Sequence, residues 1–191
     1  MKTRNVMYMA MFAAVVGVLG LLPPIPIPLT PVPITAQTLG VMLAGSLLGA
    51  RLGGGSMLIV VFLISAGMPL LSGGRGGIGV LLGPSGGYIL SWPIAAFITG
   101  WIMEKVSQKL SLSRAFAANV AGGLLVIHSC GTIYHSLIAE LPLEAAVIQT
   151  LGFLPGDTAK AAAASYTVVK IAHYHPFLFK GKPSEREKAA G

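Results

Sequence analysis

The chain has 191 residues, of which 54% are hydrophobic and only 10% are charged. A soluble domain usually carries roughly 25% charged residues, so this composition excludes a water-soluble globular protein and indicates an integral membrane protein. The net charge of +7 is better explained by membrane topology than by nucleic-acid binding, and we expect no nucleic-acid partner. The single cysteine, Cys130, excludes an internal disulfide.

Six apolar segments are candidate membrane spans, because a spanning helix needs about 20 apolar residues. They cover residues 5–22, 36–51, 54–68, 86–104, 113–137 and 155–172. The second and third are short, and Gly53-Gly54-Gly55 predicts a tight turn between them, with a re-entrant pair as the alternative. The sequence therefore predicts an all-α membrane protein with six transmembrane helices. We expect one domain over residues 1–180 and a short charged tail over residues 181–191.

The basic residues indicate the orientation, because cytoplasmic loops collect lysine and arginine. If the chain crosses six times with the N and C termini cytoplasmic, eleven basic residues share one side: Lys2, Arg4, Arg51, Lys105, Lys109, Arg114, Lys170, Lys180, Lys182, Arg186 and Lys188. An odd number of spans would scatter them. Arg75 and Lys160 are left on the opposite side, where topology does not require them.

The first span carries Ala10 and Ala14, a small-xxx-small pair on one helix face. Such a pair predicts close contact with another helix, either within the chain or in a partner.

Residues 22–34 contain six prolines alternating mostly with aliphatic residues. Proline fixes φ and removes a backbone donor, so the segment is predicted to be neither a helix nor a central strand. We expect a stiff, extended external loop, either a lid over a pocket or a plain connector. Gln37 follows at the start of the second span and could face the pocket or solvent.

Residues 73–88 place Arg75 in a glycine-rich, irregular stretch between two apolar runs. Irregular backbone persists in a membrane only against protein or beside a wet cavity, and a cation there indicates a functional site. The glycines are expected to let the backbone approach a ligand. Ser85 is predicted to cap the fourth span, whose free N–H groups would attract an anion. Tyr88 is either a pocket residue or an interfacial anchor.

Asp157 and Lys160 begin the last span and are three residues apart, so they share a helix face. They are either a self-contained ion pair or a pocket pair pressed inward by the small residues 161–164. A neighbouring acceptor and donor suit a neutral group such as a urea. An intramembrane enzyme using Asp157 would need a second catalytic group. His128 and His135 lack the further ligands of a metal site, and no metal or other cofactor is predicted.

Two motifs resemble the BioY family, the biotin-binding S components of energy-coupling factor (ECF) transporters. They are GRGG…L-x-GPSGGY over residues 74–88 and FLPGDxxK over residues 153–160. The resemblance covers nearly the whole chain and implies a six-helix domain that captures biotin from outside. Ser85 stands where the family is expected to carry threonine.

The resemblance also implies the substrate-binding residues. These are Asp157 and Lys160 towards the ureido ring of biotin, Arg75 towards its carboxylate, and Ser85, Gly86, Tyr88 and Gln37 around it.

The implied partners are a membrane coupling (T) subunit, contacted through Ala10 and Ala14, and two ATPase subunits. The chain has no Walker A sequence of its own. The implied location is the prokaryotic plasma membrane, crossed several times, and the implied activity is transport rather than catalysis. An S component for thiamine or riboflavin is the alternative, but two basic residues against one acid favour an anionic ligand.

Overall fold

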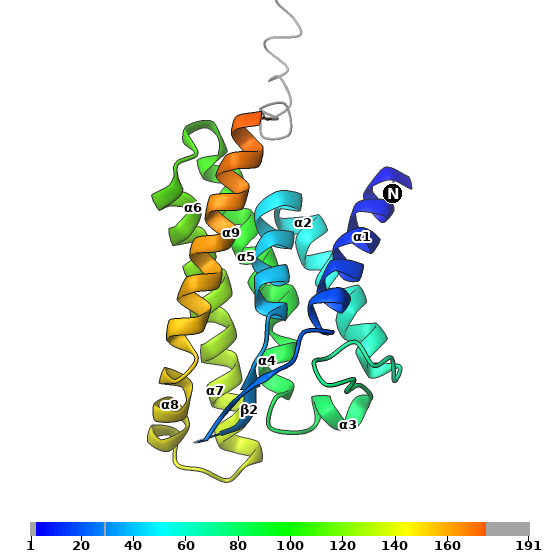
Figure 1. The fold of residues 1–191 in the computed structure, drawn as a ribbon, viewed down its shortest axis with the longest axis vertical. Coiled ribbons are helices and arrows are strands. Elements are labelled where there is room, and N and C mark those ends of the chain that lie inside the picture. The colour runs from blue at the N-terminus through cyan, green and yellow to red at the C-terminus, as the bar shows by residue number, and fades with distance from the viewer. Residues whose placement is uncertain (1–2, 29, 175–191) are drawn as a thin grey trace, which may run out of the picture.

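The structure of the protein is a computed structural model that describes residues 3–28 and 30–174 (Figure 1). Its α-helices are α1 (Thr3–Leu19), α2 (Gln37–Ser65), α3 (Ile78–Leu81), α4 (Gly86–Leu90), α5 (Trp92–Val106), α6 (Leu112–Asn119), α7 (Ile127–Ile138), α8 (Leu143–Leu151) and α9 (Leu154–Tyr174). A 3₁₀ turn η1 (Ser107–Lys109), a π-helical turn η2 (Val120–Val126) and two strands, β1 (Ile25–Ile27) and β2 (Thr30–Ile34), complete the described chain. The predicted tail at 181–191 lies outside these residues.

The long helices form a bundle, with the β-hairpin crossing it near one end (Figure 1). Among the described residues, three helical stretches are long and apolar enough to cross a membrane, namely Gln37–Ser65, Gly86–Val106 and Leu112–Ile138, and the helix Thr3–Leu19 is shorter but apolar. Large apolar side chains such as Phe62 and Leu137 are exposed on the outside of the bundle. This combination of apolar spans and an apolar exterior identifies a membrane protein.

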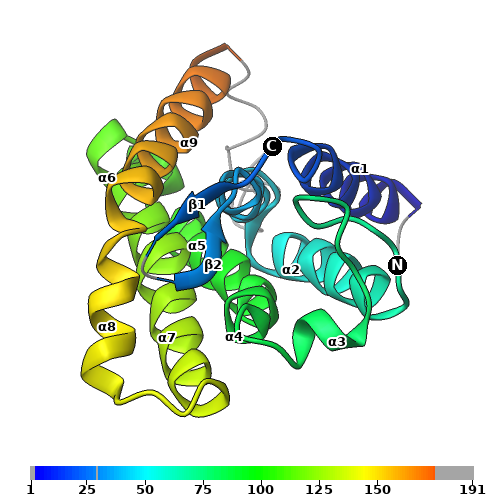
Figure 2. The same cartoon turned by 60° about the horizontal axis from the view of Figure 1, so that its bottom comes forward.

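Helix α2 reverses at Gly49, where the backbone leaves the helical region with φ of 80°. Gly53 then lies against the part of α2 that precedes Gly49. A Cβ on Gly53 would be 2.8 Å from the carbonyl oxygen of Ala44. Two arms, residues 37–48 and 50–65, therefore pack against each other, and Figure 2 shows them pointing in different directions. The predicted turn at Gly53-Gly54-Gly55 is wrong, because these glycines serve helix packing and Gly49 supplies the positive φ.

The second arm of α2 receives a cap from a distant residue. Oε1 of Glu104, near the end of α5, accepts a hydrogen bond of 2.8 Å from the backbone N–H of Ala50. The first N–H groups of a helix lack partners within the helix, and a carboxylate there is also favoured by the helix dipole. Glu104 thus stabilises the reversal at Gly49.

We expect Glu104→Ala to lower the thermal unfolding temperature of the detergent-solubilised protein, because losing a helix cap costs about 1 kcal/mol. The matched control is Glu144→Ala, which removes an exposed acid from the first turn of α8. Equal shifts for the two variants would contradict a capping role for Glu104.

The proline-rich segment is extended, as predicted, but it also forms a small antiparallel sheet that the all-α prediction lacked. Ile25 pairs with Ile34 and Ile27 with Thr30. In a two-stranded sheet both strands are edges, so prolines can point their missing donor positions away from the partner strand. The plain-connector alternative is wrong, because β2 contributes to the wall of a pocket through Val32, Pro33 and Ile34.

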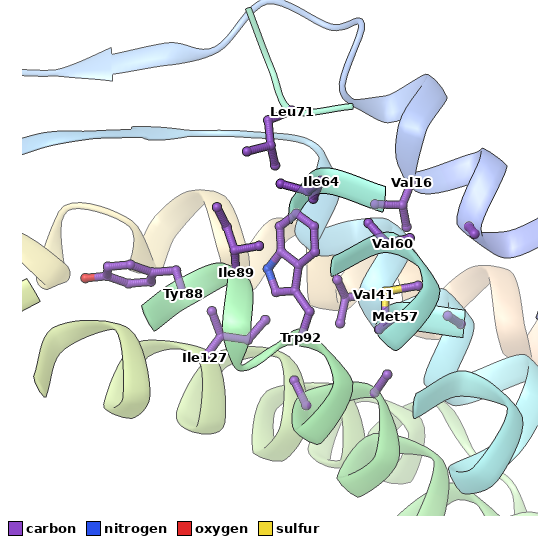
Figure 3. Close-up of a cluster of buried hydrophobic side chains, with 14 of the residues drawn as sticks. Val16, Val41, Met57, Val60, Ile64, Leu71, Tyr88, Ile89, Trp92 and Ile127 are labelled. Carbon is purple, nitrogen blue, oxygen red and sulfur yellow. The ribbon is translucent and has the colours of Figure 1, made fainter. Parts of the chain in front are cut away.

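The buried core joins the two arms of α2 to the elements around them (Figure 3). Its labelled members are Val16, Val41, Met57, Val60, Ile64, Leu71, Tyr88, Ile89, Trp92 and Ile127. Five of these side chains also line the pocket, namely those of Leu71, Tyr88, Ile89, Trp92 and Ile127. The packing of the core therefore holds the pocket wall in place.

Candidate binding site

A pocket lies beneath the β-hairpin, between α2, α4, α5, α7 and α9. Its lining combines apolar and aromatic side chains with a few polar ones: Val32, Pro33, Ile34, Thr35, Gln37, Thr38, Leu71, Arg75, Ser85, Tyr88, Ile89, Trp92, Ile127, His128, Phe153, Asp157 and Lys160. A concave apolar pocket with a few convergent polar groups is the usual form of a small-molecule site.

Asp157 and Lys160 form an ion pair at the pocket, with Nζ of Lys160 2.5 Å from Oδ1 of Asp157. Lys160 also donates to the carbonyl oxygen of Thr35 at 2.7 Å and to Oγ1 of Thr38 at 2.8 Å. Asp157 is only 3% exposed. The sequence left two alternatives, a self-contained ion pair and a pair that lines a pocket. Both descriptions apply, since the two residues pair with each other and both line the pocket.

His128 of α7 is one of the pocket residues that the sequence analysis did not predict. Its Nε2 lies 2.8 Å from Oδ2 of Asp157, and its ring stacks on Phe153 with the ring centroids 5.7 Å apart. His135, which lies on the same helix, instead bonds to Oε1 of Gln149 at 3.0 Å. The one available signal was an ionisable side chain within an apolar span, which indicates function by default.

Tyr88 is buried, so the alternative of an interfacial anchor is wrong. Its hydroxyl is 3.1 Å from Oγ1 of Thr150, and its ring lies directly against Gly131. Ser85 precedes α4 as predicted and lines the pocket, but its side chain does not cap the helix. A capping residue needs extended backbone, whereas Ser85 has φ of −85° and ψ of −7°.

Gly86 is buried, and a Cβ there would overlap the carbonyl oxygen of Leu81 and approach the Tyr134 ring. Close packing therefore explains why position 86 requires a glycine. A contact between Gly86 and a ligand stays a prediction. The glycines that need their conformational freedom are Gly73, Gly74 and Gly77, which have positive φ in the loop before α3.

Gln37 faces the pocket but uses its amide to hold other elements. Its Nε2 donates to the carbonyl oxygens of Val16 at 3.2 Å and Leu70 at 3.0 Å. Its Oε1 accepts from the backbone N–H of Ser72 at 3.3 Å. Arg75 is exposed, and its Nε donates to the carbonyl oxygen of Ser72 at 3.2 Å. Arg75 therefore lines the pocket while it remains exposed.

A family model described as the BioY family matches residues 1–177. The chain belongs to the BioY family. This confirms the resemblance inferred from the two motifs at residues 74–88 and 153–160.

Curated members of the BioY family are similar over almost their whole length. The biotin transporter BioY of Rhizobium etli is 42% identical over 183 residues, covering 93% of this chain and 98% of that protein. The probable biotin transporter BioY of Bacillus subtilis is 38% identical over 171 residues, covering 90% and 91%. These proteins are named as transporters and not as enzymes, in agreement with the sequence prediction.

The fold is also similar to a solved structure, the S-component for biotin from an ECF-type ABC transporter. The TM-score is 0.86 at 34% sequence identity, covering 90% of this chain and 92% of that chain. This BioY chain therefore has the S-component fold.

Proposed function

We propose that this chain is the biotin-specific capture (S) subunit of an ECF-type vitamin uptake transporter. The observation that carries the proposal is the pocket under the β-hairpin, whose lining includes buried Asp157 and His128, half-buried Lys160 and exposed Arg75. Biotin has a urea group at one end and a carboxylate at the other. The polar network matches the first end and the arginine the second.

Biotin is expected to lie with its ureido ring towards Asp157 and Lys160 and its carboxylate towards Arg75. The bicyclic ring would pack on the aromatic walls formed by Tyr88 and Phe153, which lie 5.8 Å apart between ring centroids. Ser85, Gly86 and Gln37 complete the set of predicted substrate contacts.

The proposed topology has six spans with both termini cytoplasmic. The spans are α1, the two arms of α2, α4 with α5, α6 with α7, and α9. The start of α1 and the end of α9 lie at the same end of the bundle (Figure 1), in keeping with an even number of crossings. Biotin would enter from outside under the β-hairpin, across the plasma membrane of a prokaryotic cell.

Isothermal titration of the purified, detergent-solubilised protein tests the proposal. Biotin is expected to bind near one to one without any ATPase subunit, desthiobiotin more weakly, and thiamine not at all. Absence of biotin binding by a sample with a cooperative thermal unfolding transition would contradict the proposal. Tight binding of thiamine instead would favour an S component for another vitamin.

The membrane coupling (T) subunit, which would bring two ATPase subunits, is proposed to dock on α1. Ala10 and Ala14 are both exposed on this helix, beside exposed Met7 and Met11. Small residues in an exposed stripe allow a second helix to approach closely.

We expect Ala14→Leu to leave biotin affinity unchanged and to reduce biotin uptake by cells about tenfold or more, because an isobutyl group in place of a methyl group separates closely packed helices. Uptake of labelled biotin and titration of the purified variant measure the two effects. The matched control is Ala162→Leu, which enlarges an exposed alanine on α9. Loss of binding in Ala14→Leu would mean that this face packs inside the chain.

A further inference from the structure

We propose that the ends of α5 and α9 form a binding surface for anionic phospholipids of the cytoplasmic leaflet. The surface consists of Trp101 and Lys105 on α5 and of Tyr166 and Lys170 on α9, and we call it the basic–aromatic surface. None of these four residues lines the pocket under the β-hairpin. The proposal therefore goes beyond the capture of a substrate, and it uses the proposed topology only to name the leaflet.

The ends of the two helices lie together in the bundle. Met103 of α5 and Val168 of α9 belong to one buried apolar cluster. Trp101 and Lys105 stand on either side of Met103 in the sequence, and all four residues of the basic–aromatic surface are exposed. Helix α9 ends at the end of the bundle that lies away from the β-hairpin (Figure 1). The surface is therefore close to the end that the proposed topology places at the cytoplasm.

Each of the two helices carries a lysine one turn beyond an exposed aromatic ring. Nζ of Lys105 lies 3.3 Å from the centroid of the Trp101 ring, and Nζ of Lys170 lies 5.5 Å from that of the Tyr166 ring. Trp101 is 48% exposed and Tyr166 is 56% exposed. This order is typical of a membrane–water boundary, because the ring lies at the level of the lipid headgroups and the ammonium group reaches towards water.

The described part of the protein does not neutralise the charge of these two lysines. Both salt bridges among residues 3–28 and 30–174 involve Asp157, which lies at the opposite end of α9. The neighbouring acid Glu104 bonds through Oε1 to the backbone N–H of Ala50. An aromatic ring covers only one side of an ammonium group, which has three N–H donors. Each lysine can therefore bind an anion as well.

The exposed face of α5 has its chemical groups in the same order as a phospholipid. Ile94 and Phe97 are exposed on the face that continues to Trp101 and Lys105. The acyl chains would lie on the two apolar side chains, the glycerol region beside the indole, and the phosphate at the ammonium group. A water-soluble acidic protein would fit the lysine but not the apolar part of this face, so we identify a lipid as the occupant.

Quenching of tryptophan fluorescence by brominated lipids tests the proposal, because a brominated acyl chain quenches an indole that lies beside it. The chain has two tryptophans, and Trp92 is only 3% exposed, so Trp101 reports the lipid next to α5. The full chain is placed in phosphatidylcholine vesicles that contain the same minor fraction of brominated phosphatidylglycerol or of brominated phosphatidylcholine. Trp101→Phe measures the contribution of Trp92.

We expect phosphatidylglycerol to be preferred at Trp101 about fivefold, which is the factor for one basic residue near an anionic surface. Equal quenching by the two brominated lipids would overturn the proposal, because it would mean that the lysine does not select the headgroup.

Lys105→Gln removes the charge beside Trp101 and is expected to abolish the preference for phosphatidylglycerol. The matched control is Lys109→Gln, which removes an exposed lysine from η1 and is expected to keep the preference. Thermal unfolding of both variants checks that they are folded. Equal losses of preference in the two variants would show a general effect of positive charge and would overturn the role of the pair of Lys105 with Trp101.

The pair on α9 is tested by moving the fluorescent reporter. In Trp101→Phe combined with Tyr166→Trp, we expect the same preference at position 166 and its loss on adding Lys170→Gln. Excess inorganic phosphate at constant ionic strength is expected to leave the preference unchanged at both positions. Loss of the preference in phosphate would identify a site for any phosphate group and would overturn the assignment to a lipid.

Discussion

Asp157→Ala is expected to weaken biotin binding about a hundredfold or more, because removing one partner of a buried ion pair costs about 3–5 kcal/mol. The carboxylate holds three groups from separate elements, namely Lys160, Thr38 and His128. Without it, the ammonium group of Lys160 is left without its buried counter-charge and His128 loses the bond that orients its ring. Titration of the purified variant with biotin measures the loss.

Asp157→Asn is the matched control, since it keeps an acceptor of the same shape and removes the charge. We expect its affinity for biotin to lie between those of the unaltered protein and Asp157→Ala. Unchanged affinity in Asp157→Ala would contradict the placement of the site at this network. A loss in Asp157→Asn as large as in Asp157→Ala would show that charge matters more than ring orientation.

Gly131→Ala is expected to lower the thermal unfolding temperature and to weaken biotin binding about tenfold, because overpacking a well-packed site costs about 1–3 kcal/mol. A Cβ at this position would overlap the ring of Tyr88. The ring has little room to move, since Phe153 lies beside it and its hydroxyl is bonded to Thr150. Displacing Tyr88 would therefore disturb the pocket wall as well as the contact between α4 and α7.

The matched control for this prediction is Gly79→Ala in α3, where a Cβ would meet no atom within 4 Å. Alanine is favoured over glycine in a helix by up to about 1 kcal/mol, so Gly79→Ala should leave stability unchanged or slightly raised. Thermal unfolding in detergent, followed by titration with biotin, compares the two variants. Similar behaviour of the two would contradict the close contact between Gly131 and Tyr88.

Local patterns in the sequence predicted several features of the site correctly. Asp157 and Lys160 share a helix face because helical geometry brings residues three apart together, and the structure pairs them. The prolines of residues 22–34 predicted an extended segment, because each ring restricts its own backbone. Low charge and long apolar runs predicted a membrane protein, because the bilayer requires them. Each of these inferences depends on residues close together in the chain.

Contacts between distant residues could not be predicted in this way. His128 bonds to Asp157 across a sequence separation of 29 residues, and Thr38 bonds to it across 119. Neither pair produces a periodic pattern in the sequence. The reversal at Gly49 was placed four residues late for the same reason. Several glycines lie close together in this part of the sequence. Tertiary contacts decide which of them forms the turn: Gly53 packs against Ala44, whereas Gly49 is followed by Ala50, whose N–H is capped by Glu104.

The sequence by itself determined the membrane class, the family and the two charged residues at the start of α9, because composition, motifs and helical periodicity act locally. Tertiary structure alone decided which polar atoms of the pocket are already paired and which are open. The sequence singled out Asp157 and Lys160, but packing pairs them with Thr35, Thr38 and His128. Among residues 3–28 and 30–174 it gives no hydrogen-bond partner to Nδ1 of His128 or Nε1 of Trp92, because hydrogen bonds are distributed only when the helices come together.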